Sequence, residues 1–461
     1  MMDIVSRLEG VVGKHRVVKD PRELKNLSKD RSFFVGNAAA AAVRPRSAAQ
    51  VSRIMRLCNE LEVGVVVHGA GSSLTGSSVV YGPAIVIDMS DMCRLLELHL
   101  DDGYVVVETG MVIGELNRRL ARYGYFYPPD PASSAFASIG GSISTNAGGL
   151  RAVMYGSTRE WVMGLEAVLP SGETIRTGRR TVKKSAGYDL TSLIVGSEGT
   201  LCVVTKAILK VVRKPEAVGR LVAYYRNPGD AVSAVLRMKR AGLPLMVAEF
   251  LDSSAIRLVE EHGGVDFPKG TEGMLMIDVC TTRDSLGRIL GEAEIAIRRN
   301  ALEVYQASNK KGMEKLYKAR RMLYEIAHRI AEESGKEIMV SDVVVPVSEL
   351  PKALKEIRAT IARRRLHAEL FCHIGDGNIH VNVTAGHGEL GKVSKSMEEF
   401  ALIALRHGGS VSGEHGIGVE KKRLFIEELE RNGSVAALEK MRQVKKAFDP
   451  KGILNRGKIF D

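Results

Sequence analysis

Cysteine is sparse in this chain of 461 residues, and its placement argues against two classes of protein. The five cysteines are scattered, odd in number and never in CxxC spacing: Cys58, Cys93, Cys202, Cys280 and Cys372. Disulfide frameworks and iron–sulfur clusters both need paired or closely spaced cysteines. We therefore expect neither of them on this chain.

Long apolar runs are also missing from the sequence. Residues 1–7 lack the apolar core of a signal peptide, and no run approaches the length that spans a bilayer. No low-complexity tract and no repeat at solenoid spacing is present. These absences predict a soluble, cytoplasmic and globular protein.

Positive charge dominates, with 66 Lys and Arg residues against 54 Asp and Glu residues and a net charge of +12. The basic residues are interspersed with acidic ones, and bursts such as 176–184 are short. This pattern does not favour nucleic-acid binding. It suits an anionic substrate, a lipid surface or an acidic redox partner.

The length predicts two or three lobes rather than one core. Apolar periodicity and helix-start chemistry at Ser47 predict a first α+β lobe that closes near residue 215. In this lobe we expect helices at about 47–61 and 112–123 and strands at 63–67, 84–88, 104–108, 161–169 and 201–212. After it, helices at about 228–241, 284–299, 314–334 and 348–364 indicate an antiparallel sheet covered by helices. The last part, 411–461, looks like a segment that docks back onto the first lobe.

A glycine loop follows the predicted strand 63–67, with the sequence Gly69-Ala70-Gly71-Ser72-Ser73-Leu74-Thr75-Gly76. Glycines let backbone N–H groups converge on a phosphate. The loop is not a P-loop, because no Lys-Ser/Thr follows Gly76, and Leu74 occupies the third glycine position of GxGxxG. Taken alone, a structural turn explains it equally well.

Further small residues and hydroxyls recur in 128–133, 138–149, 155–156, 187–190 and 196–200. Such a surface suits a long, flat cofactor that lies against the backbone. A glycine-rich packing interface is the alternative explanation.

Two histidines lie seven residues apart around the turn signal Asp376-Gly377, which predicts a hairpin. His380 and Asn382 then point to one face of the second strand, and His373 ends the first strand beside His380. Two imidazoles with oxygen ligands suit Zn²⁺ or Mn²⁺. Satisfied core histidines at a hairpin are the alternative explanation.

With these motifs the chain resembles the FAD-linked dehydrogenases of 2-hydroxy acids that carry a vanillyl-alcohol-oxidase (PCMH-type) flavin domain. Their members include the glycolate oxidase D subunit, D-lactate dehydrogenase and D-2-hydroxyglutarate dehydrogenase, and the resemblance covers about residues 35 to 460. It implies an α+β fold with a two-lobed FAD-binding domain in 1–215, whose core begins near 35. A ferredoxin-like α+β cap in 216–410 and a C-terminal segment in 411–461, which completes the active site and the FAD lobe, would follow.

The resemblance also implies which residues hold the cofactor. His68 precedes the first glycine of the loop, so we expect noncovalent FAD. Three positions depart from the family pattern: Arg456 replaces a proline, Cys372 replaces a glycine and His68 stands where arginine is common. The matching cofactor positions are Gly69, Ala70, Gly71, Ser72, Ser73, Thr75, Gly76, Pro129, Asp130, Ser133, Gly140, Gly141, Ser144, Thr145, Asn146, Gly148, Gly149, Tyr155, Gly156, Glu198, Gly199 and Asn455.

Oxidation of a 2-hydroxy acid needs a base, a hydride acceptor and a cation that grips the carboxylate, and flavin is the acceptor. In the resembled family, His415 matches the base. The metal ligands match His373, His380, Asn382 and Glu414.

For the substrate carboxylate, Arg320 lies at the edge of the apolar stripe of helix 314–334, whereas Arg321 turns toward solvent. The family has Trp-x-x-Arg where this chain has Tyr317 to Arg320. An ordinary helix-edge arginine is the alternative. Val340 stands where the hydroxyglutarate branch has a lysine, which argues against a second substrate carboxylate.

The predicted partners are a small 2-hydroxy acid and, as electron acceptor, a redox protein or a quinone, with peripheral membrane or complex association left open. One rival function is that of an alkyl-dihydroxyacetone-phosphate synthase, a flavin transferase with a run of histidines that Glu414-His415-Gly416 does not reproduce. Another is a non-catalytic FAD subunit of an oxidase complex, against which the intact histidine set argues.

Overall fold

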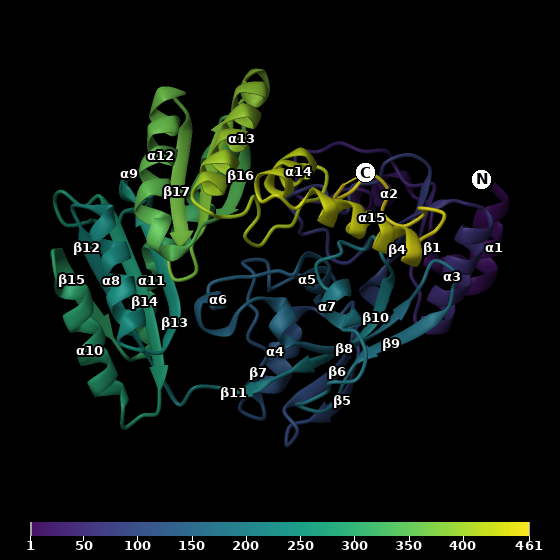
Figure 1. Ribbon diagram of the computed structural model, residues 1–461, viewed down its shortest axis with the longest axis horizontal. Helices are drawn as coiled ribbons and strands as arrows, with labels where there is room; N and C mark the ends of the chain where they lie inside the picture. Colours follow the sequence, from purple (N-terminus) through teal and green to yellow (C-terminus); the bar gives the residue numbers. More distant parts are fainter. Residues whose placement is uncertain (1, 461) are drawn as a thin grey trace. The chain divides into compact units, whose positions relative to one another are not determined.

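The computed structural model describes residues 2–460, and the chain divides into two compact units (Figure 1). The first unit comprises Met1–Gly148, Ser157–Lys214 and Glu414–Asp461, and the second comprises Gly149–Gly156 and Pro215–Gly413. The boundaries expected from the sequence were 215 and 411, without the short excursion of 149–156. Of the described helices, none has both the length and the apolar character needed to cross a membrane.

A small, largely parallel sheet opens the first unit, in the order β1-β2-β4-β3. Helix α3 (Ala48–Glu60) lies beside it and begins as predicted at Ser47, whose hydroxyl accepts a hydrogen bond from the Gln50 amide at 3.3 Å. The apolar stripe of α3 is buried against the strands. Strand and further helix bounds are β1 Val17–Val18, β2 Ala41–Val43, β3 Gly64–His68, β4 Ala84–Asp88, α1 Met2–Val12 and α2 Pro21–Leu27.

An antiparallel five-stranded sheet follows in the order β5-β6-β10-β8-β9. The passage 138–149, expected from the sequence to be a glycine-rich surface, contains the short helix α5 (Ile139–Thr145), which begins at Ser138. The remaining bounds are β5 Leu95–His99, β6 Tyr104–Glu108, α4 Ile113–Ala121, β7 Tyr125–Phe126, β8 Val162–Val168, β9 Thr174–Gly178, α7 Leu190–Ile194, β10 Val203–Lys210 and β11 Val212–Arg213.

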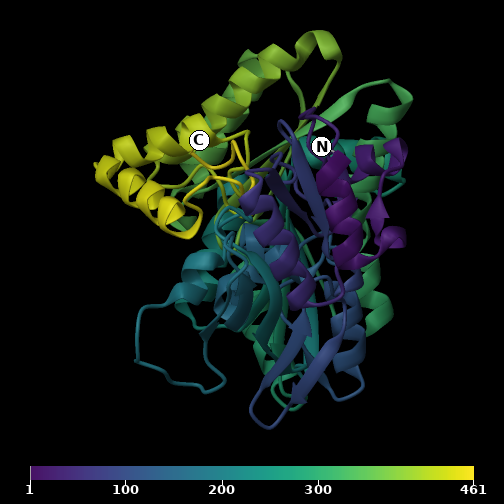
Figure 2. The same ribbon diagram turned by 90° about the vertical axis from the view of Figure 1, so that its right-hand side faces the viewer.

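The C-terminal segment from Glu414 onward belongs to the first unit. Helices α14 (Lys422–Arg431) and α15 (Val435–Phe448) pack side by side (Figure 2). Beyond them Leu454 pairs in parallel with Val65 of β3, and the Asn455 amide donates to the Val65 carbonyl at 2.8 Å. The tail thereby places Asn455 beside β3, the strand that leads into the glycine loop.

The second unit is a seven-stranded antiparallel sheet in the order β15-β12-β14-β13-β17-β18-β16. Helices α8, α10, α12 and α13 cover one face, while α9 and α11 pack on the other. The α+β class is confirmed. Strand bounds are β12 Ala217–Tyr225, β13 Leu245–Asp252, β14 Gly273–Thr281, β15 Ala301–Ala307, β16 Glu337–Val344, β17 His367–His373 and β18 Asn378–Ala385. Helix bounds are α6 Ala152–Tyr155, α8 Pro228–Arg240, α9 Ser253–Gly263, α10 Leu286–Arg298, α11 Lys310–Glu333, α12 Leu350–Arg363 and α13 Leu390–Arg406.

Candidate active site

The predicted histidine hairpin is present as β17 and β18. His373 ends β17 and pairs with Asn378, the first residue of β18. Gly377 has φ +91°, and a Cβ there would lie 1.9 Å from the Val345 carbonyl oxygen, so the turn requires glycine. The turn sets the register that places His380 and Asn382 on the same face of β18.

His373 and His380 approach each other on this face of the sheet. Their ring centroids lie 5.1 Å apart, and one nitrogen of each ring lies within 4.8 Å of the other. Both side chains are buried. Two imidazoles this close can share a divalent ion, provided that oxygen ligands complete the set.

Glu249 of β13 is a site residue that the sequence motifs did not indicate. Its carboxylate is hydrogen-bonded to Nδ1 of His373 and also accepts a hydrogen bond from Nε of Arg320 at 2.8 Å. Burial alone would raise the pKa of Glu249, but the neighbouring His373 and Arg320 bring this pKa below its usual value. The only sequence signal was a single acid inside the apolar run 245–251.

Arg320 lies on α11 and faces the sheet, as predicted. Its guanidinium lies 4.8 Å from the ring centroid of Phe371, and its side chain is only 14% exposed. A planar guanidinium beside an aromatic ring and a carboxylate is held in one orientation. The neighbouring Arg321 is exposed.

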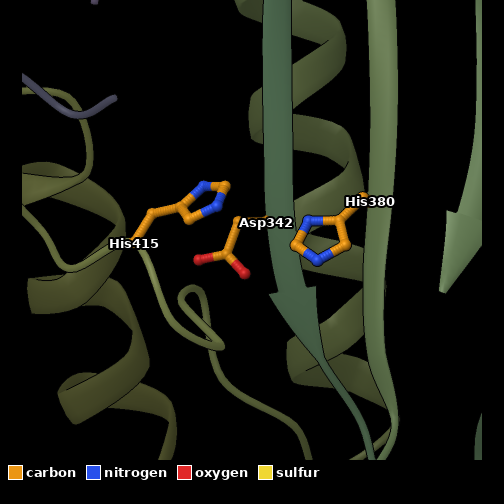
Figure 3. Close-up of side chains that lie close together, drawn as sticks. All are labelled: Asp342, His380 and His415. Carbon is orange, nitrogen blue, oxygen red and sulfur yellow. The ribbon is translucent and has the colours of Figure 1, made fainter. Parts of the chain in front are cut away.

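Asp342 of β16 is a second residue to which the sequence motifs gave no role. It pairs with His380 across the two strands, and Figure 3 shows both side chains on these neighbouring strands. Its carboxylate accepts hydrogen bonds from Asn378 Nδ2 at 2.8 Å, from Ser412 Oγ at 2.9 Å and from the Gly413 amide at 3.1 Å. Asp342 therefore fixes the chain one peptide bond before Glu414.

Glu414 and His415, the predicted ligand and base, belong to the first unit. The Thr75 hydroxyl donates to the His415 carbonyl at 3.3 Å, which links the glycine loop to this segment. A Cβ on Gly148 would lie 2.8 Å from a carboxylate oxygen of Glu414, so the glycine passage approaches this side chain closely. Within the first unit, the predicted cofactor loops and the predicted base are thus neighbours.

The glycine loop 69–76 packs closely against neighbouring segments of the first unit. A Cβ on Gly69 would lie 2.3 Å from Ser138 Oγ at the start of α5, and Gly71 has φ +60°. The amide of Glu198 donates to the Ser144 carbonyl at 2.8 Å, which joins the turn 196–200 to α5. Gly69 and Glu198 therefore both contact α5, Gly69 at its start and Glu198 near its end.

Other predicted cofactor residues are placed differently. Pro129, Asp130 and Ser133 lie between β7 and α5, and the side chain of Asn146 accepts hydrogen bonds from Arg159 and Ser157. Three predicted cofactor residues belong to the second unit: Gly149, Tyr155 and Gly156.

Asn455 carries a buried side-chain oxygen that is suited to accept a hydrogen bond from a ligand. Its Nδ2 donates to the carbonyls of Ser77 at 2.9 Å and Glu198 at 2.6 Å. Its Oδ1 is buried and has no hydrogen-bond partner among the described residues. A buried acceptor without a donor is costly, so a ligand N–H at this position would satisfy it.

Comparisons with known proteins give the ligand an identity. Residues 39–178 match the FAD binding domain family, and residues 214–459 match the family of FAD linked oxidases, C-terminal domain. The chain is 34% identical to a glycolate oxidase subunit of Bacillus subtilis, covering 91% of this chain and 88% of that protein. It is 33% identical to a D-lactate dehydrogenase of Archaeoglobus fulgidus, covering 90% of each.

Solved structures support the same fold. An alkyldihydroxyacetonephosphate synthase superposes with a TM-score of 0.78 at 18% identity, over 99% of this chain and 84% of that one. At this identity the likeness concerns the fold alone.

The residues of the first unit fit an FAD. Three glycines of the loop carry no side chain that could obstruct a ligand, and the unpaired Oδ1 of Asn455 is complementary to a ring N–H such as the isoalloxazine carries. The chain belongs to the FAD-linked oxidase family, as the resemblance implied, and is an FAD-dependent oxidoreductase.

Proposed function

We propose that this enzyme oxidises a D-2-hydroxy acid of the glycolate or D-lactate class to the 2-oxo acid. The observation that carries the proposal is the chain of contacts from His373 through Glu249 to Arg320 on one face of the sheet. It sets a histidine suited to a metal beside a guanidinium suited to a carboxylate. The hydroxy-acid relatives support the same substrate class.

Arg320 is the proposed anchor for the substrate carboxylate. Of the described residues, only Glu249 is hydrogen-bonded to its guanidinium, and that bond uses Nε. The two Nη groups can then form a bidentate pair with a carboxylate, an interaction stronger than a neutral hydrogen bond. Glu249 orients the fork and balances part of its charge.

His415 is the proposed base that takes the hydroxyl proton of the substrate. Its backbone is fixed through its carbonyl by Thr75. Bound FAD supplies the hydride acceptor, and we expect it to be held noncovalently, so acid precipitation should release it into the supernatant. The loop residues and Asn455 would hold the cofactor.

A divalent metal, Zn²⁺ or Mn²⁺, would be held by His373, His380, Asn382 and Glu414. The two buried imidazoles with amide and carboxylate oxygens form a donor set suited to such an ion. With Nδ1 of His373 hydrogen-bonded to Glu249, Nε2 would be the ligand atom, the usual arrangement of a metal-bound histidine. The ion would supply positive charge beside the substrate oxygens.

Electrons would leave the flavin for a partner protein or a quinone, with the enzyme in the cytoplasm or peripherally associated with a membrane or a complex. The basic net charge is compatible with an acidic partner.

The decisive experiment is anaerobic addition of D- and L-hydroxy acids to the yellow holoprotein. Bleaching of the flavin by glycolate or D-lactate, and not by L-lactate, is the expected result. A flavin that no hydroxy acid reduces would favour the transferase-like function or a non-catalytic subunit.

A further inference from the structure

Both carboxylate oxygens of Glu198 accept hydrogen bonds from other residues of the first unit. Oε1 accepts a hydrogen bond from the Ile417 amide at 2.7 Å, and Oε2 accepts from the Gly418 amide and from Ser77 Oγ, both at 2.8 Å. The residue is 4% exposed. The Gly-Ser-Glu-Gly turn, expected from sequence to contact the cofactor, thus also clamps the segment that follows His415.

These hydrogen bonds of Glu198 to Ile417 and Gly418, called the Glu198 clamp below, require glycine at positions 416 and 418 of the segment that follows His415. Gly416 has φ +84°, and a Cβ there would lie 2.8 Å from Oε1 of Glu198. Gly418 has φ +54°, and a Cβ there would lie 2.1 Å from the Thr75 carbonyl oxygen. Side chains at either position would separate the segment from its anchors, so the close approach and the two glycines belong together.

His415 is the first residue of a stretch of backbone that is anchored as far as Val419. Thr75 Oγ1 donates to its carbonyl at 3.3 Å, and the Thr75 carbonyl accepts from the Val419 amide at 3.0 Å. Glu198 holds the two amides in between, those of Ile417 and Gly418. The backbone from His415 to Val419 is therefore fixed at nearly every residue.

Glu198 is itself held rigidly. Its φ of +50° lies in the left-handed region, which costs free energy for a residue with a side chain and persists only where the surroundings enforce it. Its amide donates to the Ser144 carbonyl at 2.8 Å, and its carbonyl accepts from Asn455 Nδ2 at 2.6 Å. Glu198 thus connects three parts of the first unit. These are Ser77, which directly follows the glycine loop, Asn455 in the C-terminal tail, and the segment after His415.

We propose that Glu198 is a positioning residue that sets the location of the His415 imidazole relative to the glycine loop 69–76. The proposal rests on the function proposed above for His415. A shift of about 1 Å in a catalytic group can cost roughly 10²-fold in rate. A buried carboxylate with three donors is a suitable device to prevent such a shift, because each charge-assisted bond is short and directional.

The test uses Glu198→Gln in the FAD-loaded enzyme. The amide group of glutamine presents a donor to Ile417, Gly418 or Ser77, so at least one of the three bonds is lost. Hydrogen exchange followed by mass spectrometry should show faster exchange of the peptide that contains Ile417 and Gly418. The limiting rate of flavin reduction by glycolate or D-lactate should fall roughly 10- to 100-fold, while FAD stays bound and substrate Kd changes little.

Glu166→Gln is the matched control. Glu166 is also a buried carboxylate of the first unit, but it pairs with Lys206 and Arg176 on the five-stranded sheet. We expect lower thermal stability in this variant, with wild-type exchange at Ile417 and a wild-type reduction rate. If Glu198→Gln does not fold, Gly416→Ala is the second variant, because a Cβ at position 416 would push the segment away from Glu198 Oε1. It should likewise speed exchange of the peptide that contains Ile417 and Gly418 and slow flavin reduction.

A double-mutant cycle separates positioning from a general effect on fold or flavin. If Glu198 acts through His415, Glu198→Gln should slow flavin reduction little further in the His415→Ala background. A full, multiplicative loss in that background overturns the proposal, as does unchanged exchange or an unchanged rate in the single variant. A wild-type rate in His415→Ala would instead remove the base assigned under the proposed function, and the exchange result would still report on the clamp.

Discussion

Nε of Arg320 and a carboxylate oxygen of Glu249 lie 2.8 Å apart, with Glu249 buried and Arg320 nearly so. The same carboxylate is hydrogen-bonded to His373. One acid therefore connects the proposed substrate anchor on α11 to the proposed metal ligand at the end of β17. Neither of these two residues can change position without affecting the other.

The first prediction concerns Glu249→Gln. A histidine ligand that loses its carboxylate partner typically binds metal 10- to 100-fold more weakly. We expect a corresponding loss of Zn²⁺ or Mn²⁺ after equilibrium dialysis, measured by elemental analysis. The control is Asp278→Asn, a buried acid of the same sheet that pairs with Arg220 rather than with a proposed metal ligand. Equal metal content in the two variants would contradict the role of Glu249.

The sequence predicted the parts of this site that depend on local rules. The turn signal at 376–377 and the period of two along a strand were enough to place His380 near His373 and Asn382 on the same face of β18 as His380. Helical periodicity placed Arg320 toward the sheet and Arg321 toward solvent.

The parts that the sequence did not reveal depend on long-range strand order. Glu249 meets His373 across 124 positions of the chain, because β13 pairs with β17, and no local pattern encodes that neighbour. The same holds for Asp342, whose role appears only when β16 lies beside β18. Likewise, the contacts of Glu198 with Ile417 and Gly418 join segments that lie far apart along the chain.

Removal of the metal gives the second prediction. A chelator should abolish turnover and leave FAD bound, because the proposed metal ligands and the proposed cofactor residues are two separate sets of residues. Activity with hydroxy acid and the flavin absorbance would be followed together, and addition of Zn²⁺ or Mn²⁺ should restore turnover. Full activity in a preparation shown to be free of metal would eliminate the proposed site.

The third prediction concerns Arg320. Arg320→Ala should weaken substrate binding by roughly 10- to 100-fold, as expected for hydrogen bonds to a charged group worth about 1.5–3 kcal/mol. Arg320→Lys should restore binding only in part, since lysine lacks the planar fork. The substrate dependence of flavin reduction reports both effects. Arg321→Ala, on the exposed side of the same helix, serves as the control and should behave as wild type; an unchanged dependence in Arg320→Ala would move the anchor to another residue.

The fourth prediction is a pH dependence of stability. Burial lowers the pKa of the Lys458 ammonium to about 8, although Nζ donates to the Val79 carbonyl at 2.7 Å and lies 4.3 Å above the Tyr81 ring. An unfolded lysine titrates near 10.4, so between about pH 8 and pH 10 the unfolded chain binds more protons. The free energy of unfolding should therefore rise with pH in this window, by about 3 kcal/mol at most.

Lys458→Met isolates that contribution, because methionine has a similar length and no charge. Urea unfolding of both proteins, with FAD in excess, should show a steeper rise for wild type between about pH 8 and pH 10. If the free energy of unfolding changed with pH in the same way in both proteins, Lys458 would titrate as an ordinary lysine in the folded state.

The last prediction concerns His415, the proposed base. A positioned general base contributes roughly 10² to 10⁴ in rate, so His415→Ala should slow anaerobic flavin reduction by that factor. Stopped-flow measurement isolates this half-reaction, which makes the natural electron acceptor unnecessary. Because the backbone is anchored at the His415 carbonyl and at the amides of Ile417 and Gly418, alanine should leave the segment in place. Metal content, FAD content and substrate Kd should then remain near wild type, which separates loss of the base from loss of the site. Reduction at the wild-type rate would assign the proton to another group, and Asp342, which faces His380 on the same sheet, would become the next candidate.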